Sequence, residues 1–150
     1  MKKIFLILII LFLNGCGYTP LYSSKDSNYK VISLNKNVNN SLTNYVQNSI
    51  EVISNENAEK SLNISFEYNE NISVILKNSK GNPTKNRLNV VIDLSLLDSN
   101  DNLITSKQFS ESFEYNIDDN KFNLKQYEKN IKFNLIEDIT QQILVFLANV

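Results

Sequence analysis

The sequence contains no histidine and no tryptophan, and it has one cysteine, two prolines and three glycines among 150 residues. Histidine is the usual general base near neutral pH and the commonest zinc ligand, so its absence weakens enzymatic and metal-binding interpretations. Three glycines leave little material for a phosphate-binding loop, and neither a GxSxG motif nor a P-loop is present. We therefore expect no enzymatic activity, no catalytic residue, no metal site and no cofactor.

The single cysteine, Cys16, closely follows an apolar run, Ile4–Leu13, that begins just after Lys2 and Lys3. As a helix this run would span about 15 Å, whereas the hydrocarbon core of a bilayer is about 30 Å thick. A positive start, a short apolar centre and a small residue at the end are typical of an export signal that is removed. The pattern predicts a signal peptide over residues 1–15.

The residues Leu13-Asn14-Gly15-Cys16 resemble the lipobox of bacterial lipoproteins, although a smaller residue than Asn14 is commoner at that position. In that family the cysteine thiol accepts a diacylglyceryl group, and the amino group freed by cleavage is then acylated. Each buried methylene contributes about 0.8 kcal/mol, so two or more acyl chains form a stable anchor. The resemblance predicts lipidation of Cys16; the alternative is an ordinary secretory peptide with a coincidental cysteine.

Sorting between membranes depends on the residue after the lipidated cysteine. Asp at this position retains lipoproteins at the inner membrane in well-studied enteric lineages, whereas this chain has Gly17. The resemblance therefore favours the outer membrane, with the protein lipid-anchored on its periplasmic side.

The chain that follows the predicted signal has the length of one domain. Residues 16–28 are interpreted as the lipidated N-terminus and a tether, and residues 29–150 as a single domain. Without Lys2 and Lys3, thirteen basic side chains remain against sixteen acidic ones, a net charge of −3. A weakly acidic domain does not attract the phosphate backbone of nucleic acid, so we expect no nucleic-acid partner.

Two segments have the apolar spacing of amphipathic helices. The first is predicted over Ser41 to Ser54, with Asn40 or Ser41 placed to cap it. The second runs from Asn123 to Val150 and carries one long apolar stripe. A short β-branched segment, Tyr29 to Leu34, precedes the first helix and predicts a strand.

Between the two helices the apolar residues alternate with polar ones, which predicts three half-buried antiparallel strands. The first has apolar residues at even positions from Leu62 to Leu76, with a polar interruption at Asn69 to Asn71 that either a bulge or a true turn would explain. Turns are predicted at Lys77 to Arg87 and at Asp98 to Asn102. The third of these strands covers Thr105 to Tyr115, with Phe109, Phe113 and Tyr115 in one phase.

Together these elements predict an α+β fold in the order β-α-β-β-β-α. We expect a four-stranded, mostly antiparallel sheet with the two amphipathic helices packed on one face. The opposite face of the sheet would be more polar and available to a partner.

The start of the mature chain, Cys-Gly-Tyr-Thr-Pro-Leu-Tyr at Cys16 to Tyr22, is similar to the CGYxPLY start of alphaproteobacterial members of the lipopolysaccharide-assembly lipoprotein family, LptE. The predicted order of strands and helices is also that family's fold. The resemblance implies a plug inside the outer-membrane β-barrel LptD that helps the barrel assemble and passes lipopolysaccharide to the cell surface. It implies no covalent chemistry.

Aromatic rings prefer the membrane interface, and the segment behind Cys16 is rich in them. Under this resemblance the candidate contacts with the membrane interface or the barrel wall are Tyr18, Pro20, Leu21 and Tyr22. Pro20 would hold the segment extended. The alternative is a spacer with chance aromatic residues.

The predicted turn at Lys77 to Arg87 carries four cations and no acid. Lysine meets phosphate as a point charge and arginine as a bidentate fork. In the family that the chain resembles, basic loop residues at one end of the fold are implicated in lipopolysaccharide contact. The corresponding candidates are Lys77, Lys80, Lys85 and Arg87. A solvated hairpin in a lysine-rich chain is the alternative.

Two rival functions remain open at this point. One is an auxiliary lipoprotein of an intermembrane lipid-transport ABC system, which would bind a complex linked to the inner membrane. The other is a structural outer-membrane lipoprotein without a ligand. The residues after Cys16 favour the LptE interpretation over both.

Overall fold

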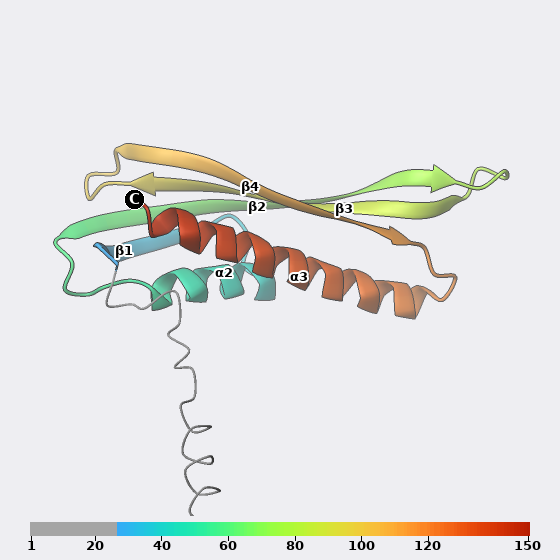
Figure 1. Ribbon diagram of the computed structural model, residues 1–150, viewed down its shortest axis with the longest axis horizontal. Coiled ribbons are helices and arrows are strands. Elements are labelled where there is room, and N and C mark those ends of the chain that lie inside the picture. Colours follow the sequence, from blue (N-terminus) through green and yellow to red (C-terminus); the bar gives the residue numbers. More distant parts are fainter. Residues whose placement is uncertain (1–26) are drawn as a thin grey trace, which may run out of the picture.

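The computed structural model describes residues 27–150, and the candidate sites at Cys16 and at 18–22 lie outside them. Six elements follow one another (Figure 1), and their order confirms the predicted β-α-β-β-β-α arrangement. Their bounds are β1 Tyr29–Lys36, α2 Ser41–Val52, β2 Lys60–Lys77, β3 Pro83–Leu97, β4 Leu103–Asn116 and α3 Lys121–Leu147. Neither α2 nor α3, the two helices of the described part, is long and apolar enough to cross a membrane.

The four strands form one sheet in the order β1-β2-β3-β4. β1 pairs with β2 in parallel through the crossover helix α2, and the other two pairings are antiparallel. The prediction of a mostly antiparallel α+β sheet is therefore confirmed. β2 continues through Asn69–Asn71 in unbroken register with β3, so the polar interruption there is neither a bulge nor a turn.

Both helices cover the same face of the sheet (Figure 1), as the sequence predicts. The core lies between the helices and the even-numbered side chains of β2 and β3, which alternate with polar side chains on the opposite face. From the sheet it contains Leu62, Ile64, Phe66, Tyr68, Leu88, Val90, Ile92, Leu94 and Leu96. From the helices it contains Val46, Ile50, Ile131, Leu135, Ile136, Ile139, Ile143, Leu144 and Leu147.

Asparagine side chains start both helices. Asn40 accepts hydrogen bonds from the backbone of Leu42 and Thr43, and Thr43 in turn accepts one from the Asn40 backbone, which completes a capping box. Asn120 accepts from the first-turn backbone of α3 in the same way. The predicted cap at Asn40 is confirmed, because its amide satisfies donors that have no partner within the helix.

The β2–β3 turn is shorter than the predicted span Lys77 to Arg87. It occupies residues 78–82, where Gly81 has a φ of 82° and the Asn78 side chain accepts from the backbone of Lys80 and Asn82. The prediction that all four cations project from a loop is therefore wrong for three of them: Lys77 ends β2, and Lys85 and Arg87 lie within β3. The cause is that local turn chemistry at Asn78 and Gly81 closes the chain in fewer residues.

Candidate functional site

The candidate site lies at one end of the molecule, which we call the hairpin end. It consists of the part of β2 that follows Tyr68, the part of β3 that pairs with it, the end of β4, and the first half of α3. Toward this end the β2–β3 hairpin and the start of α3 diverge from each other (Figure 1). The opposite end, where β1 pairs with β2 and α2 packs on the sheet, we call the closed end.

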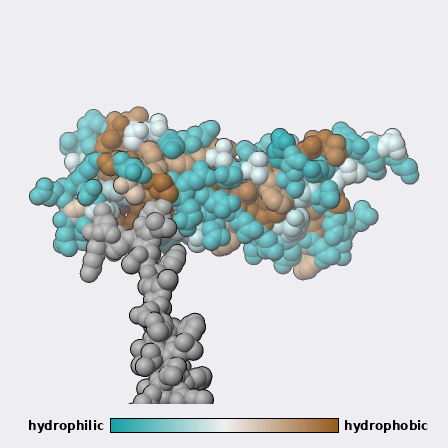
Figure 2. All heavy atoms as spheres, viewed as in Figure 1, coloured by the Kyte–Doolittle hydropathy of each residue, from teal (hydrophilic) through white to brown (hydrophobic). Residues whose placement is uncertain are grey.

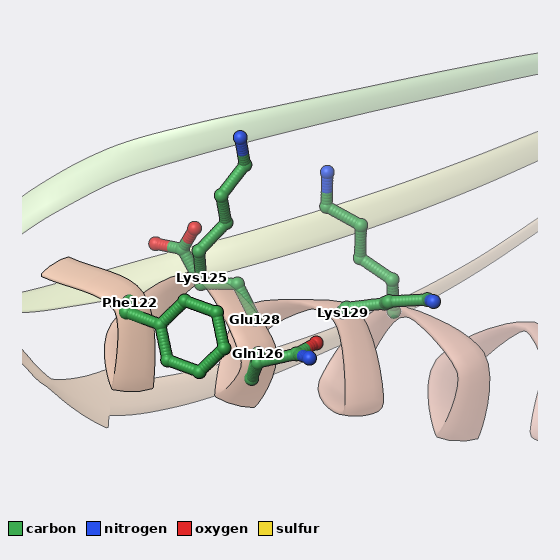
Figure 3. Close-up of a pocket in the computed structure, with 6 residues that line it drawn as sticks. Phe122, Lys125, Gln126, Glu128 and Lys129 are labelled. Carbon is green, nitrogen blue, oxygen red and sulfur yellow. The ribbon is translucent and has the colours of Figure 1, made fainter.

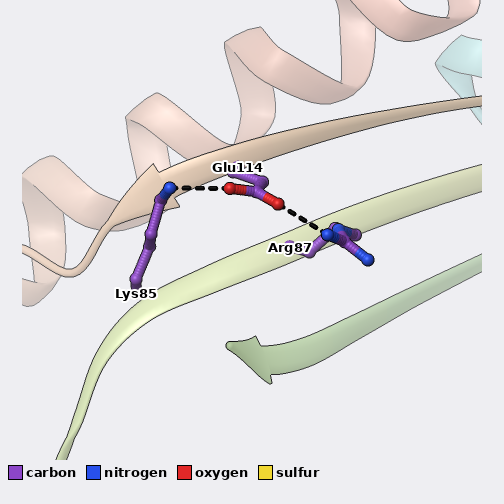
Figure 4. A network of polar contacts seen from close by, with 3 residues as sticks. All are labelled: Lys85, Arg87 and Glu114. Atoms are coloured by element: carbon purple, nitrogen blue, oxygen red, sulfur yellow. Dashed lines mark hydrogen bonds and ion pairs between the residues drawn. The ribbon is translucent and has the colours of Figure 1, made fainter. Parts of the chain in front are cut away.

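An ion-pair cluster joins β3 to β4 at the hairpin end (Figure 4). Glu114 receives Lys85 Nζ on one carboxylate oxygen and Arg87 Nη2 on the other, each at 2.6 Å. Hydrogen bonds from Lys85 and Arg87, together with their charges, hold the pKa of the Glu114 carboxyl below its ordinary value. Two of the predicted ligand-binding cations are thus already paired with an acid of the same sheet.

The other two predicted cations differ from this pair. Lys77 ends β2 and Lys80 lies in the turn, and both are exposed. Within residues 27–150 neither forms an ion pair, since the salt bridges there involve other lysines. The structure therefore divides the four candidates into a neutralised pair within β3 and an unpaired pair at the hairpin tip.

The apolar residues at the end of β2 form a second feature, which we call the distal strip. Ile72 and Val74 continue the even phase of the core residues but are 43% and 47% exposed, and Leu76, which follows a register shift and pairs with Lys85, is 55% exposed. Figure 2 shows apolar surface where the hairpin extends from the body of the molecule. No described helix covers this strip, because α2 packs at the closed end and α3 diverges from the hairpin.

A row of lysines on α3 is a feature that the sequence reasoning missed. Its members recur at helical spacing, which places them along one side of the helix: Lys121, Lys125, Lys129 and Lys132. A groove of about 440 Å³ runs beside the last three, with Phe122 at one end and Glu128 in its lining. In Figure 3 the side chain of Lys125 extends from α3 toward the strands, whereas that of Lys129 runs along the helix.

Lys132 connects this row to β2. Its Nζ lies 2.6 Å from Glu70 Oε1, and the Tyr68 hydroxyl donates to the other oxygen of Glu70 at 2.5 Å. Partial burial raises the pKa of the Glu70 carboxyl, but hydrogen bonds from Lys132 and Tyr68 outweigh burial and leave the pKa below its ordinary value. Lys125 and Lys129, by contrast, form no ion pair with another described residue.

A second tyrosine and glutamate join β4 to α3. The hydroxyl of Tyr115 donates to Glu128 Oε1 at 2.5 Å, and the Tyr115 ring meets that of Tyr127 edge-on with centroids 6.1 Å apart. Burial and the bond to Glu128 raise the pKa of Tyr115 to about 12. A neutral hydroxyl does not cancel the charge of a carboxylate, so the groove carries Glu128 together with three lysines and the Phe122 ring.

The outer edge of β2 is covered by β1 along only part of its length. The β1 pairing ends at Lys36 opposite Phe66. One step further, the Asn37 side chain donates to the Tyr68 carbonyl at 3.1 Å and accepts from the Tyr68 N–H at 2.9 Å. Beyond Tyr68 no described strand or side chain bonds the outer edge of β2, although the strand continues to Lys77.

These features are those of a binding surface. Within the described range, no group of three acidic, cysteine or histidine side chains lies close enough to hold a metal ion. The hairpin end offers instead unpaired lysines, exposed apolar side chains and an uncovered strand edge. Such groups can hold an anionic or apolar partner by contact alone.

Neither a protein-family model nor a curated protein sequence matches the chain. Its fold is nevertheless similar to those of several solved lipoproteins. A minor lipoprotein from Acinetobacter baumannii superposes with a TM-score of 0.64 at 18% identity, over 81% of this chain and 92% of that one. Rare lipoprotein B from Shewanella oneidensis gives 0.58 at 11% identity, over 80% and 97%.

Lipoprotein B from Nitrosomonas europaea gives a TM-score of 0.62 at 14% identity, over 86% of this chain and 88% of that chain. In each case the match includes nearly all of the solved lipoprotein. The chain therefore has the fold of these bacterial lipoproteins.

Proposed function

We propose that this protein is an outer-membrane lipoprotein of the LptE type, which stands inside an LptD-like β-barrel and takes part in delivering lipopolysaccharide to the cell surface. The observation that carries the proposal is the shared fold, which spans 88–97% of three solved lipoproteins. The lipobox at Cys16 and the CGYTPLY start support the same function. On this proposal the protein assembles and positions other molecules and is not an enzyme.

The first step of the proposal is the lipid anchor at Cys16. We expect metabolic labelling with palmitate to mark the full-length chain, and we expect the label to disappear in Cys16→Ser. Gly17→Asp provides the matched control, since it leaves the thiol in place. Unlabelled wild-type protein that leaves the membrane on salt washing would overturn this step.

The second step is the barrel partner. The sheet face turned away from the helices carries serine, asparagine, glutamine and charged side chains on β2, β3 and β4, for example Ser65, Asn89 and Gln108. A polar face of this kind suits the water-filled interior of a barrel better than lipid. We expect a tagged full-length chain, solubilised gently, to bring down a large outer-membrane barrel in near-equal amount.

Two other outcomes of that purification would contradict the proposal. Recovery of an ABC-transport complex would instead support the intermembrane lipid-transport function. Recovery of the lipoprotein alone, from membranes that contain an assembled barrel, would favour a structural lipoprotein without a partner.

The third step is contact with lipopolysaccharide at the hairpin tip. Lys77 and Lys80 are exposed and unpaired among the described residues, so they suit phosphate better than Lys85 and Arg87, which share Glu114. We expect Lys77→Gln combined with Lys80→Gln to weaken lipopolysaccharide binding about tenfold. Reversing the charge of Lys85 would be a poorer test, because it would also remove one of the two cations that pair with Glu114.

The matched control removes two lysines at the closed end, Lys30→Gln with Lys60→Gln. It makes the same change in net charge, and the exposed Lys30–Glu56 pair that it breaks contributes little to stability. Equal loss of binding in both double variants would mean that only net charge matters. Unchanged binding in the tip variant would assign no role to Lys77 and Lys80.

A further inference from the structure

We infer that the uncovered outer edge of β2, from Glu70 to Val74, is a docking site for an extended segment of a partner protein. The segment would add to the sheet as a new strand beside β2, in line with β1. Its side chains toward the helices would be apolar and acidic. This inference concerns a different surface from the lipopolysaccharide contact proposed at the hairpin tip, and it stands whether or not lipopolysaccharide is a ligand.

The backbone of β2 presents hydrogen-bonding groups at this edge. Both backbone groups of Tyr68 point to the outer edge, because both bond the Asn37 side chain there. Successive residues of a strand direct their N–H and C=O to alternate sides, so Glu70, Ile72 and Val74 present theirs to the same edge. The register with β3 is unbroken over these residues, so the alternation holds.

This edge also lacks the usual protection against strand addition. Natural edge strands carry charges, prolines or bulges that discourage pairing. From Asn71 to Val74 the outer edge has no proline, no charged residue and no register shift; the shifts in the pairing with β3 come only after Val74. The other edge of the sheet, β4, carries Lys107, Glu111 and Glu114 along its length. The difference marks the end of β2 as the edge that can accept a strand.

The side chains around the edge define the chemistry of the occupant. Ile72 and Val74 are exposed on the helix side and would pack against apolar side chains of an added strand. Lys132 already reaches β2 at Glu70, so the same side of α3 faces this edge. Lys129 and Lys125 lie about one and two turns further toward the hairpin end, and neither forms an ion pair with a described residue. An added strand that carries carboxylates would supply their acidic partners.

Two other occupants fit less well. A second copy of this chain would bring its own lysine row against Lys125 and Lys129, and like charges repel. The tether at residues 17–28 is too short to lay several residues along this edge: Tyr29 pairs opposite Lys60, and Ile72 lies about 40 Å further along β2. Even fully extended, the tether would reach about 40 Å, so only its membrane-anchored end could arrive.

Alternating backbone donors and acceptors distinguish a polypeptide from a lipid as the occupant. An acyl chain could cover Ile72 and Val74, but it has no amide groups to pair with the edge. A strand satisfies the backbone groups and buries the apolar side chains at the same time. Amide protection at the edge therefore separates the two occupants experimentally.

The test uses the full-length chain in neutral-lipid nanodiscs and a defined probe peptide. The peptide is blocked at both ends, about nine residues long, with threonine at odd positions and with valine and glutamate in turn at even positions. In the extended form it presents valine and glutamate on one face. We expect saturating peptide to slow residue-resolved hydrogen exchange at least tenfold at the amides of Ile72 and Val74. A peptide with lysine in place of glutamate is expected to bind at least tenfold more weakly.

The key variant is Val74→Pro, which removes an edge N–H that bonds no described residue. Proline is tolerated on an outer edge, so the core and the β3 ladder are expected to stay intact. We expect peptide affinity to fall at least tenfold. Val52→Lys is the control, because it changes a valine that is 70% exposed on α2, away from the edge, and its affinity is expected to match wild type. Val74→Lys, which keeps the N–H but charges the strip, gives a second variant should the proline disturb the fold.

Three results would overturn the inference. The first is peptide protection that is absent, or equal at the edges of β2 and β4. The second is unchanged affinity in both Val74 variants. The third is burial of the Ile72 and Val74 side chains by anionic phosphatidic-acid vesicles while the peptide fails to slow exchange of the amides of these two residues. That result would identify the strip as a lipid contact.

Discussion

The two halves of β2 have the same alternating pattern but different environments. At the closed end Leu62, Ile64 and Phe66 are buried beneath the two helices, and β1 pairs with this part of β2. At the hairpin end Ile72 and Val74 continue the same phase but are about half exposed. Alternation in a sequence therefore specifies which face of a strand is apolar. It does not specify whether the protein itself supplies the element that covers that face.

The largest expected effect tests this contrast directly with one residue type. Ile64→Ala removes a fully buried side chain and is expected to lower the free energy of unfolding by about 2–5 kcal/mol. Ile72→Ala removes the same atoms from an exposed site and is expected to cost under about 1 kcal/mol. Denaturant titration of the full-length chain in detergent measures both. Equal losses would show that the hairpin end is covered in the same way as the closed end.

The fold was predictable because its signals are local. The cap at Asn40, the period of the helices and the alternation of three strands each depend on nearby residues. The element order and the single helix-covered face followed from them. The cap at Asn120 is equally local but was not predicted, because the second helix was expected to begin at Asn123. The continuity of β2 through Asn69–Asn71 was left open, because a polar run reads the same in a turn as on an exposed strand.

The site was less predictable because it depends on contacts between distant segments. Nothing near Lys85 in the sequence shows that Glu114 neutralises it. The spacing of Lys125, Lys129 and Lys132 could have been found by counting helical turns, but its relation to β2 depends on Glu70. The uncovered edge is visible only once the length of the β1 pairing is known.

A smaller expected effect concerns the contact that holds the start of α3 against the sheet. Tyr115→Phe removes the hydroxyl that donates to Glu128, and hydrogen bonds to charged groups contribute about 1.5–3 kcal/mol. We expect a loss of about 1–2 kcal/mol in thermal unfolding. Tyr127→Phe is the control, because its side chain is about half exposed and its hydroxyl has no hydrogen-bond partner among the described residues; it is expected to change little. A larger loss in Tyr127→Phe would contradict this assignment.

The stability contribution of Glu70, which lies where the two halves of β2 meet, is expected to depend on pH. The pKa of Glu70 is lower in the folded chain than its ordinary value of 4.5. Its contribution to stability is therefore present above about pH 4.5 and is lost as the pH falls through the folded pKa. Because the side chain is 37% exposed, we expect this contribution to stay under about 1 kcal/mol.

Glu70→Gln is expected to flatten the acid limb of the stability curve. Glu67→Gln, on the opposite face of the same strand, is the control and is expected to leave that limb unchanged. Unfolding midpoints measured from pH 7 to pH 3 compare the two. An unchanged acid limb in Glu70→Gln would mean that the contact with Lys132 does not stabilise the folded chain.

The smallest expected effect concerns the distal strip. Val74→Lys places a charge on an exposed edge, so we expect the free energy of unfolding to change by under about 0.5 kcal/mol. Circular dichroism and thermal unfolding of the full-length variant measure this. A loss comparable to that of Ile64→Ala would show that the strip is part of the core.

The central claim is that the end of β2 accepts a strand from a partner. Residue-resolved hydrogen exchange of the full-length chain, alone in nanodiscs and assembled in its native membrane, tests this claim most directly. In the isolated chain we expect fast exchange at the amides of Ile72 and Val74 and slow exchange at Asn71 and Ser73, whose amides face β3. In the membrane assembly we expect the Ile72 and Val74 amides to become at least tenfold slower. Equally fast exchange of these two amides in both states would contradict the account, because the end of β2 would then accept no strand.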